Sequence, residues 1–242
     1  MKTNHLKEKT KFFIKKRLST YTFIKNRLRY NQVAHPDKTL YLNTNEINLW
    51  LKRNSKLRRI TILGEIIDGD WDINAKTKDI FFEENLKYKG IVEHFVEKLP
   101  WEETVLFKIK YAEQLKINGK VYGCKSLKDL AVFYKHKAEP LYESIKRHGL
   151  VPQYNKHVSP ILLNIGRRGD FIFTTDGDHR FFIATILGIE IIPVKIWCRH
   201  VLWQQTREKL PDLVTNLKGS SNKLIDHPDL QDIINNIQHK QT

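Results

Sequence analysis

The sequence predicts an α/β protein of the α+β kind, in which helices pack on a small mixed sheet. Three observations support this prediction. Short runs rich in β-branched and aromatic residues lie between turn residues, apolar residues at helical spacing follow them, and glycines stand where helices would end. The clearest succession is in residues 140–197, where helix, strand pair, turn, helix and strand follow one another.

The N-terminal region is predicted to begin with a basic amphipathic helix over residues 6–30. Lysine and arginine separate apolar residues that fall near helical spacing, at Phe13, Leu18, Tyr21, Ile24 and Leu28. Residues 58–63 then read as a strand, because they are rich in β-branched and apolar side chains.

Residues 81–137 form a predicted helical insertion. One helix covers 81–99 and stops before Pro100, and a second covers 101–117. Ser126 begins a capping-box variant and therefore opens a third, short helix. We expect these helices to be core and scaffold.

The second half of the chain alternates helices with strands. Pro140 and Gly149 bound a predicted short helix, because proline suits the first helical position and glycine the C-terminal cap. Strands over 161–165 and 171–175 form a predicted hairpin. A helix over 181–187 follows and is stopped by a glycine.

The last predicted elements are a strand over 190–196 and two helices, which begin near Trp203 and Leu224. These elements divide the chain into three predicted parts: a basic helical arm at 1–45, a domain at 46–200 that contains the insertion, and a helical extension at 201–242.

Positive charge is concentrated at the N-terminus. The formal net charge is +15, and the first 60 residues hold 16 Lys and Arg against 3 Asp and Glu. Basic helices bind anionic membrane surfaces or the phosphates of nucleic acids. Residues 1–30 are therefore expected to contact an anionic membrane surface or nucleic acid, with a solvated tail as the remaining alternative.

Composition also indicates the cellular compartment. No apolar run approaches the ~18 residues of a membrane-spanning helix, and no secretory signal is present. Cys124 and Cys198 are too far apart to form a disulfide framework. Two free thiols suit a reducing compartment, so we expect a cytoplasmic protein, with peripheral membrane attachment left open.

The most informative motif is D-G-D-H-R, between the apolar runs 171–175 and 181–187. Asp-Gly favours a tight turn, so the last residues of the motif enter the first turn of a helix. The N–H groups there and the helix dipole favour an anion, and phosphate is the usual one. The alternative is a simple helix cap with a surface ion pair. The residues predicted to form this anion site are Asp176, Gly177, Asp178, His179 and Arg180.

Residues 138–197 resemble the N-terminal domain of the ParB/sulfiredoxin superfamily. The matching patterns are L-x-x-S-I-x-x-x-G-L at 141–150, D-G-x-H-R at 176–180 and L-G-x-x-x-I-P-V at 187–194. The resemblance implies a compact domain that holds nucleotide phosphates at the turn. Members of the superfamily include CTP-binding partition proteins, ATP-using sulfiredoxins and free-serine kinases, and the D-G-x-H-R form is most similar to the kinase branch.

Two departures narrow the resemblance. Sulfiredoxins carry a nucleophilic cysteine where this chain has Asp178, so sulfiredoxin chemistry is not expected. Partition proteins carry a second arginine where this chain has Phe181, and a helix-turn-helix domain follows their core. Together with G-D-W-D and R-H-x-x-W-x-x-x-R, the motif is similar to ParB-like proteins of archaea and viruses.

A second cluster, residues 64–72, has four acids within eight residues, at what the sequence predicts to be a strand end. Carboxylates in such a group can hold Mg²⁺ or take a proton from a substrate hydroxyl. The alternative is a polar turn with Trp71 in the core. The resemblance to the kinase branch implies a catalytic base after the first strand, and Glu65 is the nearest match. The predicted catalytic residues are Glu65, Asp70 and Asp72, and the predicted Mg²⁺ ligands are Asp68, Asp70 and Asp72.

A third group follows the last predicted strand. A helix from Trp203 onward would place Arg207 on the same face one turn later. Guanidinium groups bind anions in a bidentate manner, so this group is expected to hold the anionic part of a substrate. The alternative is a strand end with a tryptophan packed on the core. The predicted substrate-binding residues are Trp71, Arg167, Arg199, His200 and Arg207.

These observations give a leading functional hypothesis and two alternatives. The resemblance implies a nucleoside triphosphate or diphosphate and Mg²⁺ as cofactors, and the protein is expected to transfer a phosphoryl group from the nucleotide to a small hydroxylated acceptor. The first alternative is a non-enzymatic adaptor that depends on nucleotide or binds DNA. The second is a nuclease, which the acidic cluster keeps open.

Overall fold

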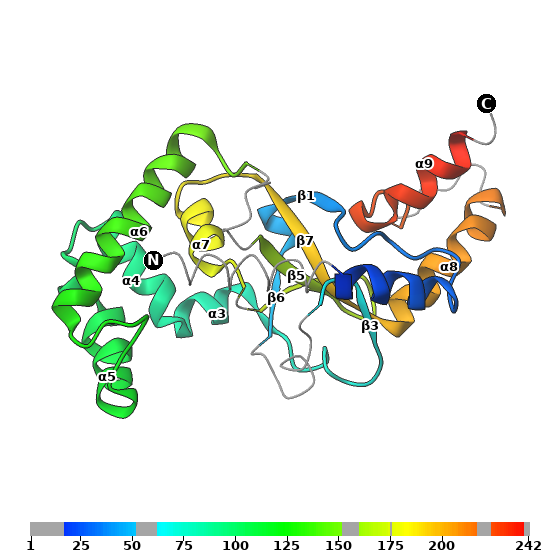
Figure 1. Cartoon of the computed structure of the whole chain (residues 1–242). Coiled ribbons are helices and arrows are strands. Elements are labelled where there is room, and N and C mark those ends of the chain that lie inside the picture. Colours follow the sequence, from blue (N-terminus) through cyan, green and yellow to red (C-terminus); the bar gives the residue numbers. More distant parts are fainter. Residues whose placement is uncertain (1–16, 52–61, 152–159, 175, 217–223, 240–242) are drawn as a thin grey trace. The chain divides into compact units, whose positions relative to one another are not determined.

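The computed structural model describes residues 17–51, 62–151, 160–174, 176–216 and 224–239 (Figure 1). It confirms an α/β fold with a mixed sheet. The chain divides into two compact units, each made from separate stretches of sequence. Unit 1 comprises Met1–Ala75, Pro152–Asp176 and Pro193–Thr242, and unit 2 comprises Lys76–Val151 and Gly177–Ile192.

The sheet of unit 1 has the order β1-β7-β5-β6-β2, and β3 also pairs with β7 (Figure 1). Its strands are β1 (Thr39–Asn43), β2 (Leu49–Trp50), β3 (Glu65–Ile67), β5 (Ile161–Ile165), β6 (Phe171–Phe173) and β7 (Ile191–His200), of which the first two residues belong to unit 2. β5 is parallel to β7 and antiparallel to β6, while β2 is parallel to β6. β7 is buried along almost its whole length, as expected of a strand with neighbours on both edges.

The predicted hairpin is confirmed by the pairing of β5 with β6. Its turn is closed by a hydrogen bond from the Gly166 N–H to the Asp170 carbonyl. Gly169 adopts φ 94°, a conformation that glycine reaches without steric cost. β6 ends at Phe173, two residues before the predicted strand end.

The helices of unit 1 lie at both ends of the sequence. Residues 17–27 are helical, and the predicted helix before residue 17 lies outside the described residues. The segment after this helix is hydrogen-bonded to α8 (Val201–Asn216). The backbone N–H groups of Asn31 and Gln32 both donate to the carboxylate of Glu208, which lies in α8. α9 (Gln231–His239) contacts α8, as Figure 1 shows.

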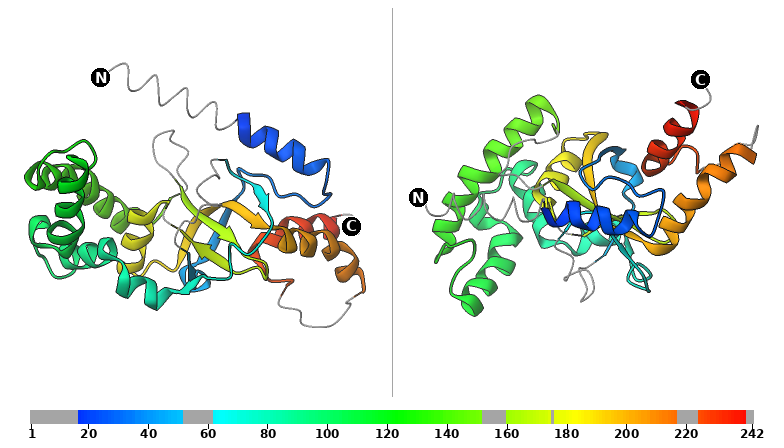
Figure 2. Two further views of the ribbon diagram at one scale, coloured as in Figure 1. Left: turned by 90° about the horizontal axis from the view of Figure 1, so that it is seen from below. Right: turned by 45° about the vertical axis from the view of Figure 1, so that its right-hand side comes forward.

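Unit 2 contains the predicted helical insertion, packed around aromatic side chains. Its elements are the short strand β4 (Lys76–Thr77) and the helices α3 (Lys78–Glu84), α4 (Leu86–Phe95), η2 (Trp101–Glu103), η3 (Leu106–Tyr111), α5 (Ala112–Asn118), α6 (Leu127–His148) and α7 (Asp178–Ile186). The buried rings include Phe81, Trp101, Phe107, Phe181 and Phe182. Figure 2 shows these elements from two further directions.

The prediction of a separate helix beginning at Pro140 is wrong. α6 runs without interruption from Leu127 to His148 with Pro140 inside it, between the predicted caps Ser126 and Gly149. Proline deprives one carbonyl of its helical donor. The helix continues because both halves bury residues on one face, such as Tyr134 before the proline and Ile145 after it.

Two predicted helices of the insertion are each divided. The expected helix over 81–99 breaks at Asn85, whose side chain caps α4 by accepting the N–H groups of Lys87 and Tyr88. The expected helix over 101–117 consists of η2, the wider π-helical turn η3, and α5.

The strand predicted over 58–63 falls mostly outside the described residues. Ile62 and Leu63 form a bend and a turn, and the strand β3 begins later, at Glu65. Glu65 therefore lies in a strand and not after one. Among the described helices, none has both the length and the apolar content needed to cross a membrane.

Candidate functional site

The D-G-D-H-R motif forms the predicted turn and helix start. Gly177 is the N-cap of α7 with φ 85°, and Asp178 and His179 are the first helical residues. The backbone carbonyl of Asp176 accepts a hydrogen bond from the N–H of Leu162 within unit 1. The chain passes into unit 2 at Gly177, so residues 177–180 of the motif belong to unit 2.

A buried ion pair occupies the start of α7. The Lys87 ammonium, from α4, lies 2.6 Å from Asp178 Oδ2, and both side chains are largely shielded from solvent. Burial alone would raise the pKa of the Asp178 carboxyl, but its hydrogen bond with His179 and the charge of Lys87 hold that pKa well below its usual range. Asp178 is therefore ionised at neutral pH.

A chain of hydrogen bonds leads away from Asp178. Its Oδ1 lies 3.1 Å from His179 Nδ1, which places the imidazole proton on that nitrogen. Nε2 is then the acceptor for the Tyr134 hydroxyl at 3.1 Å. The Tyr134 hydroxyl also bonds to that of Tyr111, and Tyr111 bonds in turn to Tyr122.

The hydrogen-bond chain closes on itself and reaches the surface. Tyr122 also hydrogen-bonds to Lys87, which brings the network back to Asp178. Burial raises the pKa of the Tyr111 and Tyr134 hydroxyls, so both stay protonated. Tyr122 is 53% exposed and holds φ 50°, a strained value for a residue with a side chain.

The surroundings of this network carry an excess of positive charge. Lys110, on η3, is partly buried near both Lys87 and Asp178. Burial lowers the pKa of the Lys110 ammonium, and the charge of Lys87 lowers it further. Arg180, the last residue of the motif, is 5% exposed, and its Nη2 donates to the Val151 carbonyl at 3.4 Å. Burial also lowers the pKa of its guanidinium.

The acidic cluster in unit 1 is held by Arg167. The guanidinium donates to both carboxylate oxygens of Asp72, at 2.9–3.2 Å, and to Asp70 at 2.8 Å. The backbone N–H of Arg167 also donates to Asp72, at 2.7 Å. The Asp72 side chain is 6% exposed, whereas that of Asp70 is 78% exposed. The sequence analysis assigned Asp70 and Asp72 to catalysis and Mg²⁺ binding and Arg167 to substrate binding, whereas the structure brings the three together as an ion-pair cluster.

His200 and Trp71 support the same loop. His200 Nε2 donates to the Gly69 carbonyl at 2.7 Å, and its Nδ1 accepts the N–H of Leu202. Trp71 is buried beside His200, with ring centroids 5.8 Å apart, and its indole N–H lies 3.4 Å from the Ile67 carbonyl. This is the core position that sequence analysis gave as the alternative for Trp71.

The residues present do not fit the predicted Mg²⁺ site. Within the described ranges, no group of three or more His, Cys, Asp or Glu is placed to hold a metal ion. The carboxylates of Asp70 and Asp72 already accept hydrogen bonds from the Arg167 guanidinium, and Asp68 Oδ1 accepts the N–H of Gly69. Glu65 is partly buried in β3; burial raises the pKa of its carboxyl and the charge of Lys25 opposes this.

The third predicted group forms a buried ionic cluster. Arg199 Nη2 lies 2.6 Å from Asp229 Oδ1, and Arg207 Nη1 lies 3.1 Å from Asp229 Oδ2. Arg207 also binds Asp232, and Trp203 donates its indole N–H to Asp229. All but Asp232 are at most 3% exposed, so neither guanidinium presents a surface to a soluble acceptor.

Sequence reasoning missed the partners of the α7 turn. Lys87, Lys110, Tyr111, Tyr122 and Tyr134 belong to the insertion that was expected to be only scaffold. Apart from Lys110 and Tyr111, which are neighbours in η3, they come from separate parts of the insertion, so no spacing in the sequence links them. The capping residue Asn85, which sets the start of α4 and hence the position of Lys87, was the one local signal available.

Comparisons with protein-family models, with curated proteins and with solved structures found no match to this chain. The ParB/sulfiredoxin resemblance therefore stays a prediction that rests on the motifs alone.

The lowered carboxyl pKa values predict loss of stability in acid. Asp178 and Asp229 both have a pKa below the ~3.9 of an unfolded aspartate, so unfolding takes up protons once the pH approaches that value. We expect the contribution of these two carboxyls to the free energy of unfolding to be constant from about pH 7 to 5 and to fall steadily below about pH 4, as measured by the urea midpoint of the wild type relative to Asp229→Asn. The fall should be shallower in Asp229→Asn, and equal slopes for the two proteins would contradict this assignment.

Proposed function

We propose that this protein binds a nucleotide through phosphate contacts at the start of α7 and transfers a phosphoryl group to a small hydroxylated acceptor. The observation that carries the proposal is the charge balance at that turn. Lys87 is ion-paired with Asp178, and Lys110 lies close enough to both for their charges to act on it, beside the positive end of a helix dipole.

The shortage of negative charge favours an anionic ligand. Lys110 is partly buried next to another ammonium, which destabilises its charged form. A phosphate group placed there would relieve this repulsion and would also accept hydrogen bonds from the first turn of α7. The side chain of His179 is partly exposed, so it would contact a ligand bound at the start of α7.

The hydrogen-bond chain supports transfer to a hydroxyl group. An acceptor hydroxyl beside Tyr122 could pass its proton to the Tyr122 oxygen, while each tyrosine passes its own proton along the chain to His179 Nε2. The ionised Asp178 would stabilise the imidazolium formed. General-base assistance of this kind contributes about 10²–10⁴ in rate.

Binding is tested by comparing two lysines of η3. Lys110→Met removes the proposed phosphate contact, and Lys108→Met removes the same charge at an exposed position two residues earlier. We expect Lys110→Met to weaken nucleotide binding by roughly 10- to 100-fold, the value of a charge-assisted hydrogen bond. Calorimetric titration with ATP, GTP and CTP measures it. Equal affinities of the two variants would contradict the proposal, as would no binding to the wild-type protein.

Transfer is tested separately with Tyr122→Phe, which removes one hydroxyl from the exposed end of the chain. We expect nucleotide affinity to be kept and acceptor-dependent nucleotide consumption to fall. A variant with unchanged turnover would exclude the proton pathway while leaving nucleotide binding intact.

A non-enzymatic switch is the second candidate. It is favoured by one observation: the motif spans the point where the chain leaves unit 1 for unit 2, between Asp176 and Gly177. If the protein binds nucleotide but does not consume it in the presence of any hydroxylated acceptor, the switch is the better candidate. For either function we propose a cytoplasmic location, which is supported by the free thiols of Cys124 and Cys198.

A further inference from the structure

Helix 17–27 of unit 1 and Leu28, the turn residue that follows it, expose apolar side chains that the rest of the described chain does not cover. Leu18, Tyr21, Ile24 and Leu28 are 40%, 66%, 54% and 86% exposed. Their spacing of three and four residues puts them on one face, which we name the apolar stripe. Most single exposed apolar residues need no explanation, but four in a row on one face mark an interaction surface.

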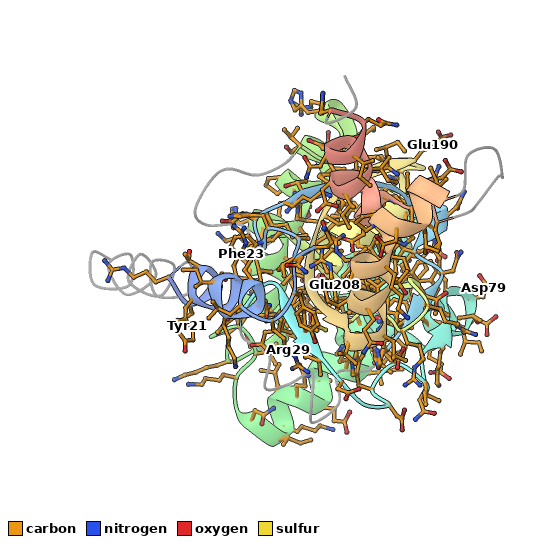
Figure 3. The ribbon with its side chains drawn as sticks, turned by 90° about the vertical axis from the view of Figure 1, so that its right-hand side faces the viewer. Tyr21, Phe23, Arg29, Asp79, Glu190 and Glu208 are labelled. Carbon is orange, nitrogen blue, oxygen red and sulfur yellow. The ribbon has the colours of Figure 1, made fainter. Side chains whose placement is uncertain are left out.

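The opposite face of this helix anchors it to unit 1. Asn26 donates to the Gly64 carbonyl at 3.0 Å, Ser19 is buried, and Phe23 packs edge-to-face on His35. Figure 3 shows Tyr21 and Phe23 leaving the helix on different sides. The stripe is therefore presented outward by a helix whose other side is fixed.

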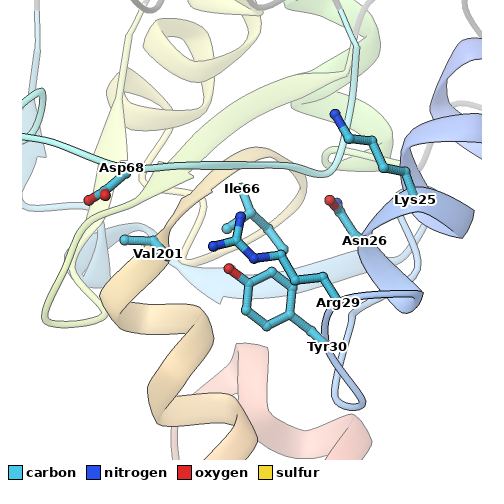
Figure 4. Close-up of a pocket in the computed structure, with 7 residues that line it drawn as sticks. All are labelled: Lys25, Asn26, Arg29, Tyr30, Ile66, Asp68 and Val201. Carbon is cyan, nitrogen blue, oxygen red and sulfur yellow. The ribbon is translucent and has the colours of Figure 1, made fainter.

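A small polar pocket lies at the end of the same helix. It has a volume of about 180 Å³ and is lined by Lys25, Asn26, Arg29, Tyr30, Ile66, Asp68 and Val201 (Figure 4). Among the lining residues, Lys25 and Arg29 supply two positive charges and Asp68 supplies one carboxylate, which already accepts the Gly69 N–H; the charge of Lys25 also acts on the neighbouring Glu65 carboxyl. Cations, an amide and a phenol are groups that bind a phosphate ester.

The pocket and the stripe are neighbours along the helix. Lys25 follows Tyr21 by four residues and precedes Leu28 by three, so these apolar side chains flank it. A phosphate in the pocket would thus lie at the border between basic and apolar surface. A phospholipid has the matching arrangement, because its charged headgroup lies next to its apolar acyl chains.

We propose that helix 17–27 docks on an anionic phospholipid surface, with a headgroup phosphate in the Lys25–Arg29 pocket and the apolar stripe in the acyl-chain boundary. The concentration of positive charge in the first 60 residues complements an anionic membrane and attracts the arm to it. Every residue involved belongs to unit 1, so the proposal is independent of nucleotide binding in unit 2.

The test is co-sedimentation of the full chain with vesicles of phosphatidylcholine, with and without phosphatidylserine. Binding should require phosphatidylserine. The double variant Lys25→Gln/Arg29→Gln should bind about 30-fold more weakly, at roughly fivefold per basic side chain near an anionic surface. Lys135→Gln/Lys137→Gln removes the same charge from exposed positions of unit 2 and should bind as the wild type does.

The stripe is tested by Leu28→Ser, and because Leu28 is 86% exposed, we expect the variant to fold as the wild type does. Burial of a leucine side chain corresponds to about tenfold or more in partitioning, so that loss is expected. Ile117→Ser, at a residue 72% exposed outside this helix, should change nothing.

Four results would overturn the proposal. The first is equal binding of the wild type to vesicles with and without phosphatidylserine, and the second is an equal loss of vesicle binding in the two double variants. The third is binding of inorganic phosphate without binding of vesicles. The fourth is tighter binding to a DNA duplex than to vesicles, with no effect of Leu28→Ser. Dimerisation in solution that Leu28→Ser abolishes, without vesicle binding, would also overturn it and assign the stripe to a second copy of the chain.

Discussion

Replacement of Asp229 by asparagine is expected to lower the free energy of unfolding by about 3–5 kcal/mol, the usual cost of breaking a buried ion pair. Asp229 is fully buried and receives hydrogen bonds from Arg199, Arg207 and the indole of Trp203. Asparagine keeps the shape but turns an N–H₂ group toward guanidinium donors. Two buried positive charges would then lose their common counter-ion.

Urea unfolding measures this loss, with Asp170→Asn as the control. Asp170 makes the same kind of contact with Arg168, but Arg168 is 82% exposed and the side chain of Asp170 is 40% exposed. An exposed pair is worth about 0–1 kcal/mol, so the identical substitution should have little effect there. Similar losses at the two positions would show that burial does not set the value of the Asp229 cluster.

Gly169→Ala is expected to destabilise the protein by about 2–5 kcal/mol, for two reasons that add. Gly169 holds φ 94°, and a left-handed conformation costs a residue with a Cβ about 1–2 kcal/mol. A Cβ at this position would also lie 2.6 Å from the Trp203 ring, and overpacking of this kind costs about 1–3 kcal/mol. Trp203 cannot yield easily, because it is buried and bonded to Asp229.

Gly188→Ala separates the two contributions. Gly188 has φ 66°, but a Cβ there would meet nothing within 4 Å. Only the conformational cost of about 1–2 kcal/mol is therefore expected. A Gly169→Ala protein no less stable than Gly188→Ala would mean that the Trp203 contact is not tight, which circular dichroism of both variants in urea would reveal.

Elements that carry their own boundary signals could be predicted from the sequence. The β5–β6 hairpin has a glycine-containing turn, and α7 has a turn before it and Gly188 after it. Pro140 led to a wrong prediction of a helix start, because the packing of α6 on both sides of the proline outweighs this local signal. That packing involves residues whose contacts a single sequence does not display.

The candidate sites were harder to predict, because their partners are distant in sequence. Arg199 and Arg207 have the composition of an anion site, but Asp229, which neutralises them, comes 30 residues after Arg199. Likewise Lys87 meets Asp178 from 91 residues away. Residue types indicate that a charge needs a partner, and only the fold determines whether that partner is a ligand or the protein itself.

The position of β7 in the sheet determines the order in which the chain can fold during synthesis. β1 and β3 both pair with β7, yet of the strands in the described residues β7 is made last. Until Ile191–His200 leaves the ribosome, both earlier strands present unpaired edges, at which nascent chains can associate wrongly. At about 5–20 residues per second this exposure lasts for about 7–30 s. The protein is therefore expected to need chaperones during translation more than one whose strands pair in the order of synthesis.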